Sequence, residues 1–117
     1  MSSARATYDV VIAGGGPAGA SAAIHLAAQG ARVLVAEQKH FPREKLCGEF
    51  ISPECLEHFT RLGVMQSMLD AGGAGLTETR FYSRSGRSVS VPSEWFGRAS
   101  VAALGLSRAE MDARLLA

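Results

Sequence analysis

The sequence predicts an α/β fold organised around a βαβ unit with parallel strands, and three observations in its first 37 residues predict it. Residues 10–13 are a short apolar run rich in β-branched side chains, which is typical of a buried parallel strand. A glycine-rich turn follows and leads directly into an alanine-rich stretch with helical character. Residues 32–36 are a second apolar run, and it ends at an acid, Glu37. Strand, turn, helix, strand and acid in this order predict a dinucleotide-binding fold.

The glycine-rich turn has the spacing Gly14-x-Gly16-x-x-Gly19. In such a turn the first glycine permits the tight bend, the second lets the backbone approach a diphosphate, and the third lets the helix pack closely on the strand. Pro17 suits the first turn of a helix, where its missing N–H costs nothing. The free N–H groups and positive end of the helix then face the diphosphate, so these four residues are candidate cofactor-binding residues.

The helix is expected to continue to about Gln29, because Gly30 stands where a left-handed C-cap belongs. Glu37 follows at about the ~20-residue offset expected for the acid that hydrogen-bonds a ribose. A carboxylate at that position would repel a 2′-phosphate, so we expect the adenosine of FAD or NAD rather than that of NADP. Gln38, the next residue, is grouped with Glu37 in the candidate site.

Composition and charge exclude several other classes of protein. The 117 residues carry a net charge of +1, 47% are hydrophobic and 20% are charged, so no basic field for nucleic acid is indicated. No apolar run approaches the ~20 residues of a membrane span, so any membrane association is expected to be peripheral only. No signal peptide is predicted. Cys47 and Cys55 lack the spacing of a metal site or a C-x-x-C pair, which favours a reduced, cytoplasmic protein without a metal.

A loop is predicted directly after Glu37, because residues 38–52 contain proline, glycine and a cluster of charges. This loop leaves the carboxyl end of the second strand, where ligands bind in open α/β sheets. Arg43 and Lys45 could help to neutralise a diphosphate or an anionic substrate, and the alternative is that they are solvated loop charges. Ser52-Pro53 is then a helix start, and a second helical stretch is expected over residues 64–71.

The periodicity changes from helical to alternating after Thr77. A turn signal at Ser85-Gly86 predicts a β-hairpin that begins a separate, substrate-side sheet. Trp95 and Phe96 follow in a loop, where they either line a substrate cavity or pack in the core. Ser107 and Glu110 form a capping box at the start of a last helix, and Arg108 is the first residue of that helix.

We therefore divide the chain into three regions. Residues 1–76 are expected to form the βαβ region and the helices that follow it, residues 77–102 the hairpin segment, and residues 103–117 a return helix of the first region. No C-cap follows that helix, and too few strands are predicted for a complete doubly wound fold, so we interpret the chain as truncated and its dinucleotide-binding βαβ domain as incomplete.

The residues described above resemble the FAD-dependent oxidoreductases that include geranylgeranyl reductases, aromatic-ring hydroxylases and flavin-dependent halogenases. The resemblance is closest to the geranylgeranyl reductase branch. It rests on residues 8–19, Glu37, residues 42–48 and residues 106–115. The first segment is shared by very many flavoproteins, whereas Lys45-x-Cys47-Gly48 is narrower and indicates the reductase-like branch.

This resemblance implies that FAD is the cofactor and that Ala18 and its neighbours contact its diphosphate. It further implies that Cys47 and Gly48 lie near the flavin and that Arg108 reaches the FAD from its helix start. The alternatives are an inert buried thiol for Cys47 and a surface position for Arg108. No catalytic acid or base is predicted, and Glu49 is the one titratable residue of interest beside this loop.

The function expected from this resemblance is that of the N-terminal FAD-binding portion of a geranylgeranyl reductase-like oxidoreductase. It would act on a small apolar molecule, for example an isoprenoid, with NAD(P)H or another electron donor. The alternatives are an FAD-dependent monooxygenase, hydroxylase or halogenase, an NAD-dependent dehydrogenase, and an inactive fragment. The sequence does not choose among the substrates of these classes.

Overall fold

The computed structural model describes residues 5–47, 49–96 and 103–117. In chain order the elements are β1 Val10–Ala13, α1 Pro17–Ala28, β2 Val33–Ala36, β3 Phe50–Ile51, α2 Pro53–Arg61, α3 Met65–Asp70, β4 Ala74–Leu76, β5 Glu78–Tyr82, β6 Ser88–Pro92, the 3₁₀ helix η1 Ser93–Phe96, β7 Ala103–Gly105 and α4 Arg108–Leu116. Within these residues the strands form a parallel pair, β1–β2, a three-stranded antiparallel sheet in the order β3–β7–β4, and a hairpin, β5–β6.

The predicted βαβ unit is confirmed. β1 and β2 run parallel, with Val10 opposite Val33 at one end and Ala13 opposite Ala36 at the other. One face of this pair packs against α1, and the opposite face leaves Val11 64% and Leu34 38% exposed. Parallel sheets normally have both faces covered, and these two strands carry more apolar surface than α1 alone covers.

Two of the predicted glycine roles are visible in the backbone around α1. Gly14 has a φ of 103°, a left-handed conformation that favours glycine in the tight turn after β1. A Cβ on Gly19 would lie 1.9 Å from the carbonyl oxygen of Gly14, so only glycine lets α1 approach the turn this closely. At the other end of α1, Gly30 follows the C-cap with a φ of 89°, as expected.

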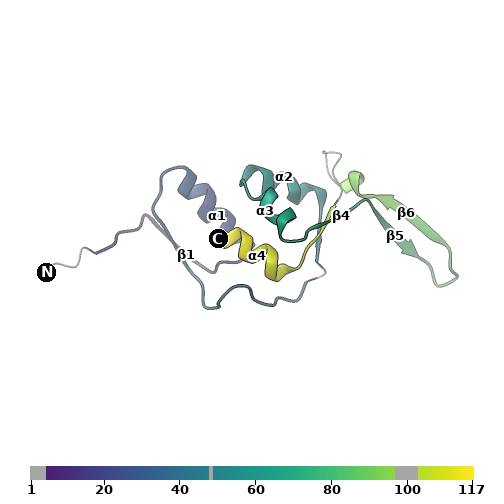
Figure 1. Ribbon diagram of the computed structural model, residues 1–117, viewed down its shortest axis with the longest axis horizontal. Coiled ribbons are helices and arrows are strands. Elements are labelled where there is room, and N and C mark those ends of the chain that lie inside the picture. The colour runs from purple at the N-terminus through teal and green to yellow at the C-terminus, as the bar shows by residue number, and fades with distance from the viewer. Residues whose placement is uncertain (1–4, 48, 97–102) are drawn as a thin grey trace.

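The hydrophobic core lies between the helices and the three-stranded sheet. α4, yellow in Figure 1, packs against α1 and α3, and α2 covers β7. The buried apolar side chains come from α1, α2, α3, α4, β3, β7 and the residue after β7, and they are Ala20, Ile51, Leu56, Phe59, Met68, Ala103, Leu104, Leu106, Met111 and Leu115. The βαβ unit and the later helices therefore share one core, which fixes the start of α4 beside the start of α1.

β3 and β4 were not predicted. They contain two and three residues, and both pair with β7 near the end of the chain. Strands this short show no alternation of polar and apolar residues, so periodicity cannot reveal them. Their position depends on β7, which is distant in the sequence.

The predicted hairpin is confirmed as β5–β6, in which Glu78 pairs with Pro92 and Tyr82 with Ser88. Figure 1 shows that it projects away from the helices. Trp95 follows in η1 and is 72% exposed, so the core position expected for it is wrong, whereas its role in lining a substrate cavity stays a prediction. The side chain of Phe96 lies outside the described residues.

The division into three regions is a prediction that the fold leaves open, and residues 97–102 at its last boundary are not described.

The helices begin as the sequence predicts, with one difference in capping. The hydroxyl of Ser107 accepts a hydrogen bond of 3.2 Å from the N–H of Glu110, as the capping box requires. Ser52 occupies the N-cap of α2 but makes no such bond, and its hydroxyl lies 3.5 Å from the sulfur of Cys55 instead. Among the described residues, no helix combines the length and the apolar character needed to cross a membrane.

Candidate cofactor site

The N-terminus of α1 is open to an anion. Gly16 is the N-cap residue, and no side chain of the described chain caps its helix. The first turn contains no acid, and it begins with Pro17. The first backbone N–H groups of a helix have no partner within the helix, and they carry its positive partial charge. The N-terminus of α1 therefore presents donors and positive potential without an acidic side chain in its own first turn.

Glu37 lies at this turn, at the end of β2. Its Oε2 accepts a hydrogen bond of 2.8 Å from the backbone N–H of Gly15, and its Oε1 accepts one of 2.8 Å from the N–H of Lys39. These two bonds, the bond from Gly15 first, lower the pKa of Glu37, and the charge of Arg43 adds to the effect. Because its pKa is lowered, Glu37 is ionised at neutral pH. Each of its carboxylate oxygens can accept a further hydrogen bond, so Glu37 can still accept bonds from ribose hydroxyls.

A cluster of one acidic and two basic side chains lies beside the same turn. Asp112 on α4 is completely buried, and it accepts hydrogen bonds of 3.0 Å from Nε and from Nη2 of Arg108. Nη1 of Arg43, from the loop after β2, lies 3.0 Å from Oδ2 of the same carboxylate. The hydrogen bond to Asp112 is the main cause of a raised pKa for Arg108, and Cys47 contributes less. One carboxylate thus faces two guanidinium groups, and one positive charge is left over.

The cluster fits a diphosphate by three observations. The guanidinium of Arg43 lies over the N-cap residue, because its Nη2 is 3.7 Å from where a Cβ of Gly16 would be. Nη1 of Arg43 is buried and, despite its ion-pair distance to Asp112, has no hydrogen-bond acceptor in good geometry among the described residues. Arg108 lines the same pocket as Pro17 and Ala18 at the start of α1. Arg43 therefore lies at the helix N-terminus and Arg108 lines the pocket beside it, where a dianion would be bound.

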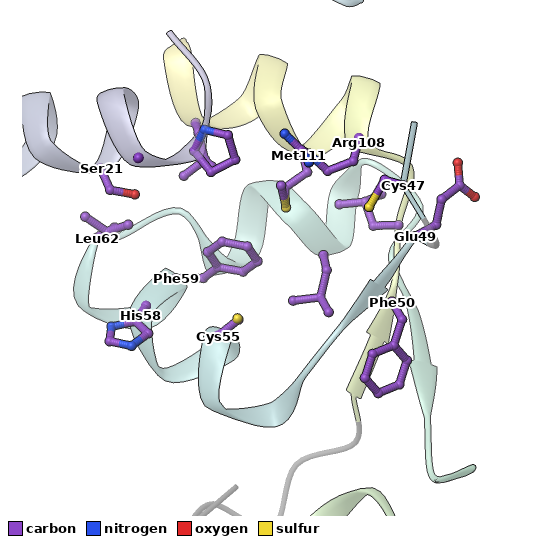
Figure 2. Close-up of a pocket in the computed structure, with 15 residues that line it drawn as sticks. Ser21, Cys47, Glu49, Phe50, Cys55, His58, Phe59, Leu62, Arg108 and Met111 are labelled. Atoms are coloured by element: carbon purple, nitrogen blue, oxygen red, sulfur yellow. The ribbon is translucent and has the colours of Figure 1, made fainter. Parts of the chain in front are cut away.

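A pocket of about 460 Å³ opens beside this cluster. Its lining comes from the start of α1, the loop around β3, α2 and α4, and it is mainly apolar (Figure 2). Cys47 and Cys55 both line it, and both are exposed free thiols. Cys47 is therefore not the inert buried thiol that the sequence left open as an alternative. Glu49 also lines the pocket, but its carboxylate projects away from the centre in Figure 2.

The structure brings most of the predicted site residues to one end of the βαβ unit. Gly16, Ala18, Glu37, Arg43 and Arg108 lie around the start of α1. The side chains of Arg43 and Arg108 are only 16% and 21% exposed, so the solvated alternatives for them are wrong. Gln38 is exposed, and Gly48 lies outside the described residues.

Asp112 is a residue of this cluster that the sequence did not predict. The available signal was its spacing from Arg108, because residues four apart on a helix face each other. That signal is weak, since most such pairs lie in solvent. Only the fold shows that this pair is buried and that Arg43 joins it.

The fold and this arrangement define a nucleotide-binding α/β domain with an anion site at the N-terminus of its first helix. Residues 7–114 match the family described as FAD binding domain, and the chain belongs to that family. FAD is therefore its cofactor.

Known proteins similar to this chain include a reductase, an FAD-dependent halogenase and a reductase-like protein. A menaquinone reductase from Mycolicibacterium smegmatis is 45% identical over 62 residues, which are 53% of this chain and 15% of that protein. The myxobacterial chondrochloren halogenase, an FAD-dependent halogenase, superposes with a TM-score of 0.80 and 29% identity over 93% of this chain and 25% of the halogenase chain. A geranylgeranyl bacteriochlorophyll reductase-like protein from Thermoplasma acidophilum superposes with a TM-score of 0.72 and 25% identity over 93% of this chain and 26% of that chain.

The chain thus spans about 15% of the length of the menaquinone reductase and about a quarter of each of the two solved chains. The similarity covers the FAD-binding domain, and it leaves the reaction of the whole protein to be inferred.

Proposed function

We propose that this chain is the N-terminal FAD-binding part of a flavin-dependent oxidoreductase of the geranylgeranyl reductase-like kind. Its substrate would be a small apolar molecule with carbon–carbon double bonds, and isoprenoid chains are the class that we favour. NAD(P)H or another donor would supply the electrons. The observation that carries the proposal is the combination of an anion site at the start of α1 with a loop that brings Cys47 to the same pocket as Arg108.

Each part of the site has a separate task in this proposal. The N-terminus of α1, Arg43 and Arg108 would bind the diphosphate, and Glu37 would accept hydrogen bonds from the ribose. The loop with Cys47 would lie toward the flavin. FAD, when bound, supplies hydride or oxygen chemistry at its isoalloxazine ring. The residues of this chain would anchor and orient that ring without donating or accepting a proton in the reaction.

Two features support the reductase branch over the other flavin enzymes. The segment Lys45-Leu46-Cys47-Gly48 resembles that branch. The matched relatives include a menaquinone reductase and a geranylgeranyl bacteriochlorophyll reductase-like protein.

The exposed face of the β1–β2 pair also supports a role as one part of a larger protein, because parallel sheets are normally covered on both faces.

Expression of the complete reading frame that contains residues 1–117 tests this proposal. We expect a yellow protein that releases FAD on denaturation and that, once reduced, adds two hydrogen atoms to an isoprenoid side chain in the absence of oxygen. Menaquinone is a suitable probe substrate, and mass spectrometry would measure the hydrogen gain. A protein that binds no FAD, or one that reduces no isoprenoid double bond with any donor, would overturn the proposal.

Similarity to the chondrochloren halogenase favours a second candidate, an oxygen-dependent halogenase or monooxygenase. The two candidates differ in their need for oxygen. Turnover that requires molecular oxygen, with or without halide, would support the second candidate, whereas turnover that proceeds anaerobically would support the reductase.

A further inference from the structure

We propose that Asp112 is a positioning residue for the cofactor, which holds Arg43 and Arg108 in the orientation that binds the FAD diphosphate. The proposal rests on the function proposed above for this site. Asp112 would not touch the cofactor, because its carboxylate is completely buried and both of its oxygens are used by the arginines.

The arrangement connects two elements that are distant in the sequence. Arg108 and Asp112 lie one turn apart on α4, whereas Arg43 lies in the loop that follows β2. The carboxylate of Asp112 binds Arg108 in a bidentate manner and contacts Nη1 of Arg43 at 3.0 Å. It is thus the shared anchor that ties this loop to α4 at the mouth of the cofactor site.

Charge explains why such an anchor is needed. Two guanidinium groups aimed at one dianion repel each other before the dianion arrives, and a buried carboxylate between them removes that repulsion. A buried carboxylate without partners would itself be very unfavourable, so the three groups stabilise one another. After this pairing one positive charge remains to attract the diphosphate.

Each arginine keeps a terminal nitrogen outside its contact with Asp112, and Arg108 lines the pocket at the start of α1. Arg108 gives Nε and Nη2 to Asp112, which leaves its Nη1 outside the bidentate pair. Arg43 uses Nη1 for its contact to Asp112 and keeps Nη2 near Gly16. A diphosphate bound at the start of α1 could accept hydrogen bonds from Nη2 of Arg43 and from Nη1 of Arg108 without disturbing the contacts to Asp112.

Charge alone and positioning predict opposite signs for the loss of Asp112. If only net charge mattered, the Asp112→Asn variant would bind the cofactor more tightly, because a negative charge near the diphosphate would be gone. If Asp112 positions the two arginines, the same variant binds more weakly even though the site has become more positive. The direction of the change therefore decides between the two accounts.

The experiment measures binding of FAD, ADP and adenosine by calorimetry to the FAD-free protein expressed from the complete reading frame. For Asp112→Asn we expect FAD and ADP to bind about tenfold more weakly or worse, since hydrogen bonds to a charged group are lost. Adenosine lacks the diphosphate, and its affinity should stay within about twofold of wild type. The control is Glu110→Gln, which removes one negative charge from the same helix at a side chain 41% exposed and should change none of the three.

Several outcomes would overturn the positioning role. These are an Asp112→Asn protein that binds ADP as tightly as wild type or more tightly, and one that loses ADP and adenosine binding in equal measure, which indicates general damage. If Asp112→Asn does not fold, Arg43→Lys and Arg108→Lys replace it, since both keep the charge and lose the planar donor set. Wild-type ADP affinity in both lysine variants would then overturn the proposal. Failure of the wild-type protein to bind FAD would instead refute the proposed function.

Discussion

The backbone N–H of Gly15 donates a hydrogen bond of 2.8 Å to Oε2 of Glu37, 22 residues further along the chain. This bond joins the glycine turn after β1 to the end of β2, so the helix N-terminus and the acid keep a fixed distance. In the proposed site the turn would face the diphosphate of FAD and the acid would face the neighbouring ribose. The contact would thus hold the adenosine half of that site in place before FAD binds.

Replacing Glu37 with Arg should weaken FAD binding by roughly tenfold or more, because the ribose loses its charged acceptor. The change also removes the acceptor for the N–H groups of Gly15 and Lys39. Fluorescence titration of the FAD-free protein with FAD measures the effect. Unchanged affinity would show that Glu37 does not bind the ribose.

The same residue predicts a pH dependence of stability. The folded protein lowers the pKa of Glu37 below its ordinary value of 4.5, chiefly through the N–H of Gly15. A lowered pKa contributes stability that is fully present above pH 4.5 and is lost as the pH falls through the folded value. The pKa of Asp9 is also lowered, so total stability will fall in acid for more than one reason.

Comparison with Glu37→Gln isolates the contribution of Glu37. The difference in thermal unfolding midpoint between wild type and this variant, measured on FAD-free protein, should be largest near neutral pH and should shrink below pH 4.5. A difference that stays constant from neutral pH into acid would contradict the assignment.

Gly19→Ala should destabilise the protein by about 1–3 kcal/mol, because the new Cβ would lie 1.9 Å from the carbonyl oxygen of Gly14. Without that clash the substitution would stabilise α1 by up to about 1 kcal/mol, so the sign is informative. The control is Gly105→Ala, whose Cβ would meet no atom closer than 3.6 Å. Chemical denaturation measures both, and a stabilised Gly19→Ala protein would refute the close approach of helix and turn.

The two serine N-caps should differ in how much they contribute to stability. Ser107→Ala should cost about 1 kcal/mol, because the bond from the N–H of Glu110 to the Ser107 hydroxyl is lost. Ser52→Ala should cost clearly less, since the hydroxyl of Ser52 caps no backbone group of α2. Thermal unfolding of the two variants side by side checks this, and equal losses would show that both hydroxyls cap in solution.

The two free thiols predict a protection pattern. Cys47 and Cys55 are both exposed and line the same pocket, so a maleimide should modify both in the FAD-free protein. If Cys47 lies toward the flavin, bound FAD should slow its modification more than that of Cys55. Peptide mass mapping after timed labelling measures the two rates, and equal protection would place the flavin elsewhere.

The sequence by itself determined the features that depend on interactions between neighbouring residues. The strand at residues 10–13, the roles of Gly14 and Gly19, the cap at Gly30 and the start of α4 at Ser107 each depend on a few adjacent residues. The position of Glu37 at the glycine turn follows from the short βαβ connection, which allows few arrangements. These features were therefore predictable before any tertiary contact was known.

Only the tertiary structure decided which polar side chains are buried together. Arg43 reads as a solvated loop charge and Asp112 as one member of an ordinary helical pair, yet the packing of α4 beside α1 buries both in one cluster. The same packing creates β3 and β4, whose few residues gain order only by pairing with β7. Such contacts join segments that are far apart in the chain, and no local pattern of residues predicts which of these segments will meet.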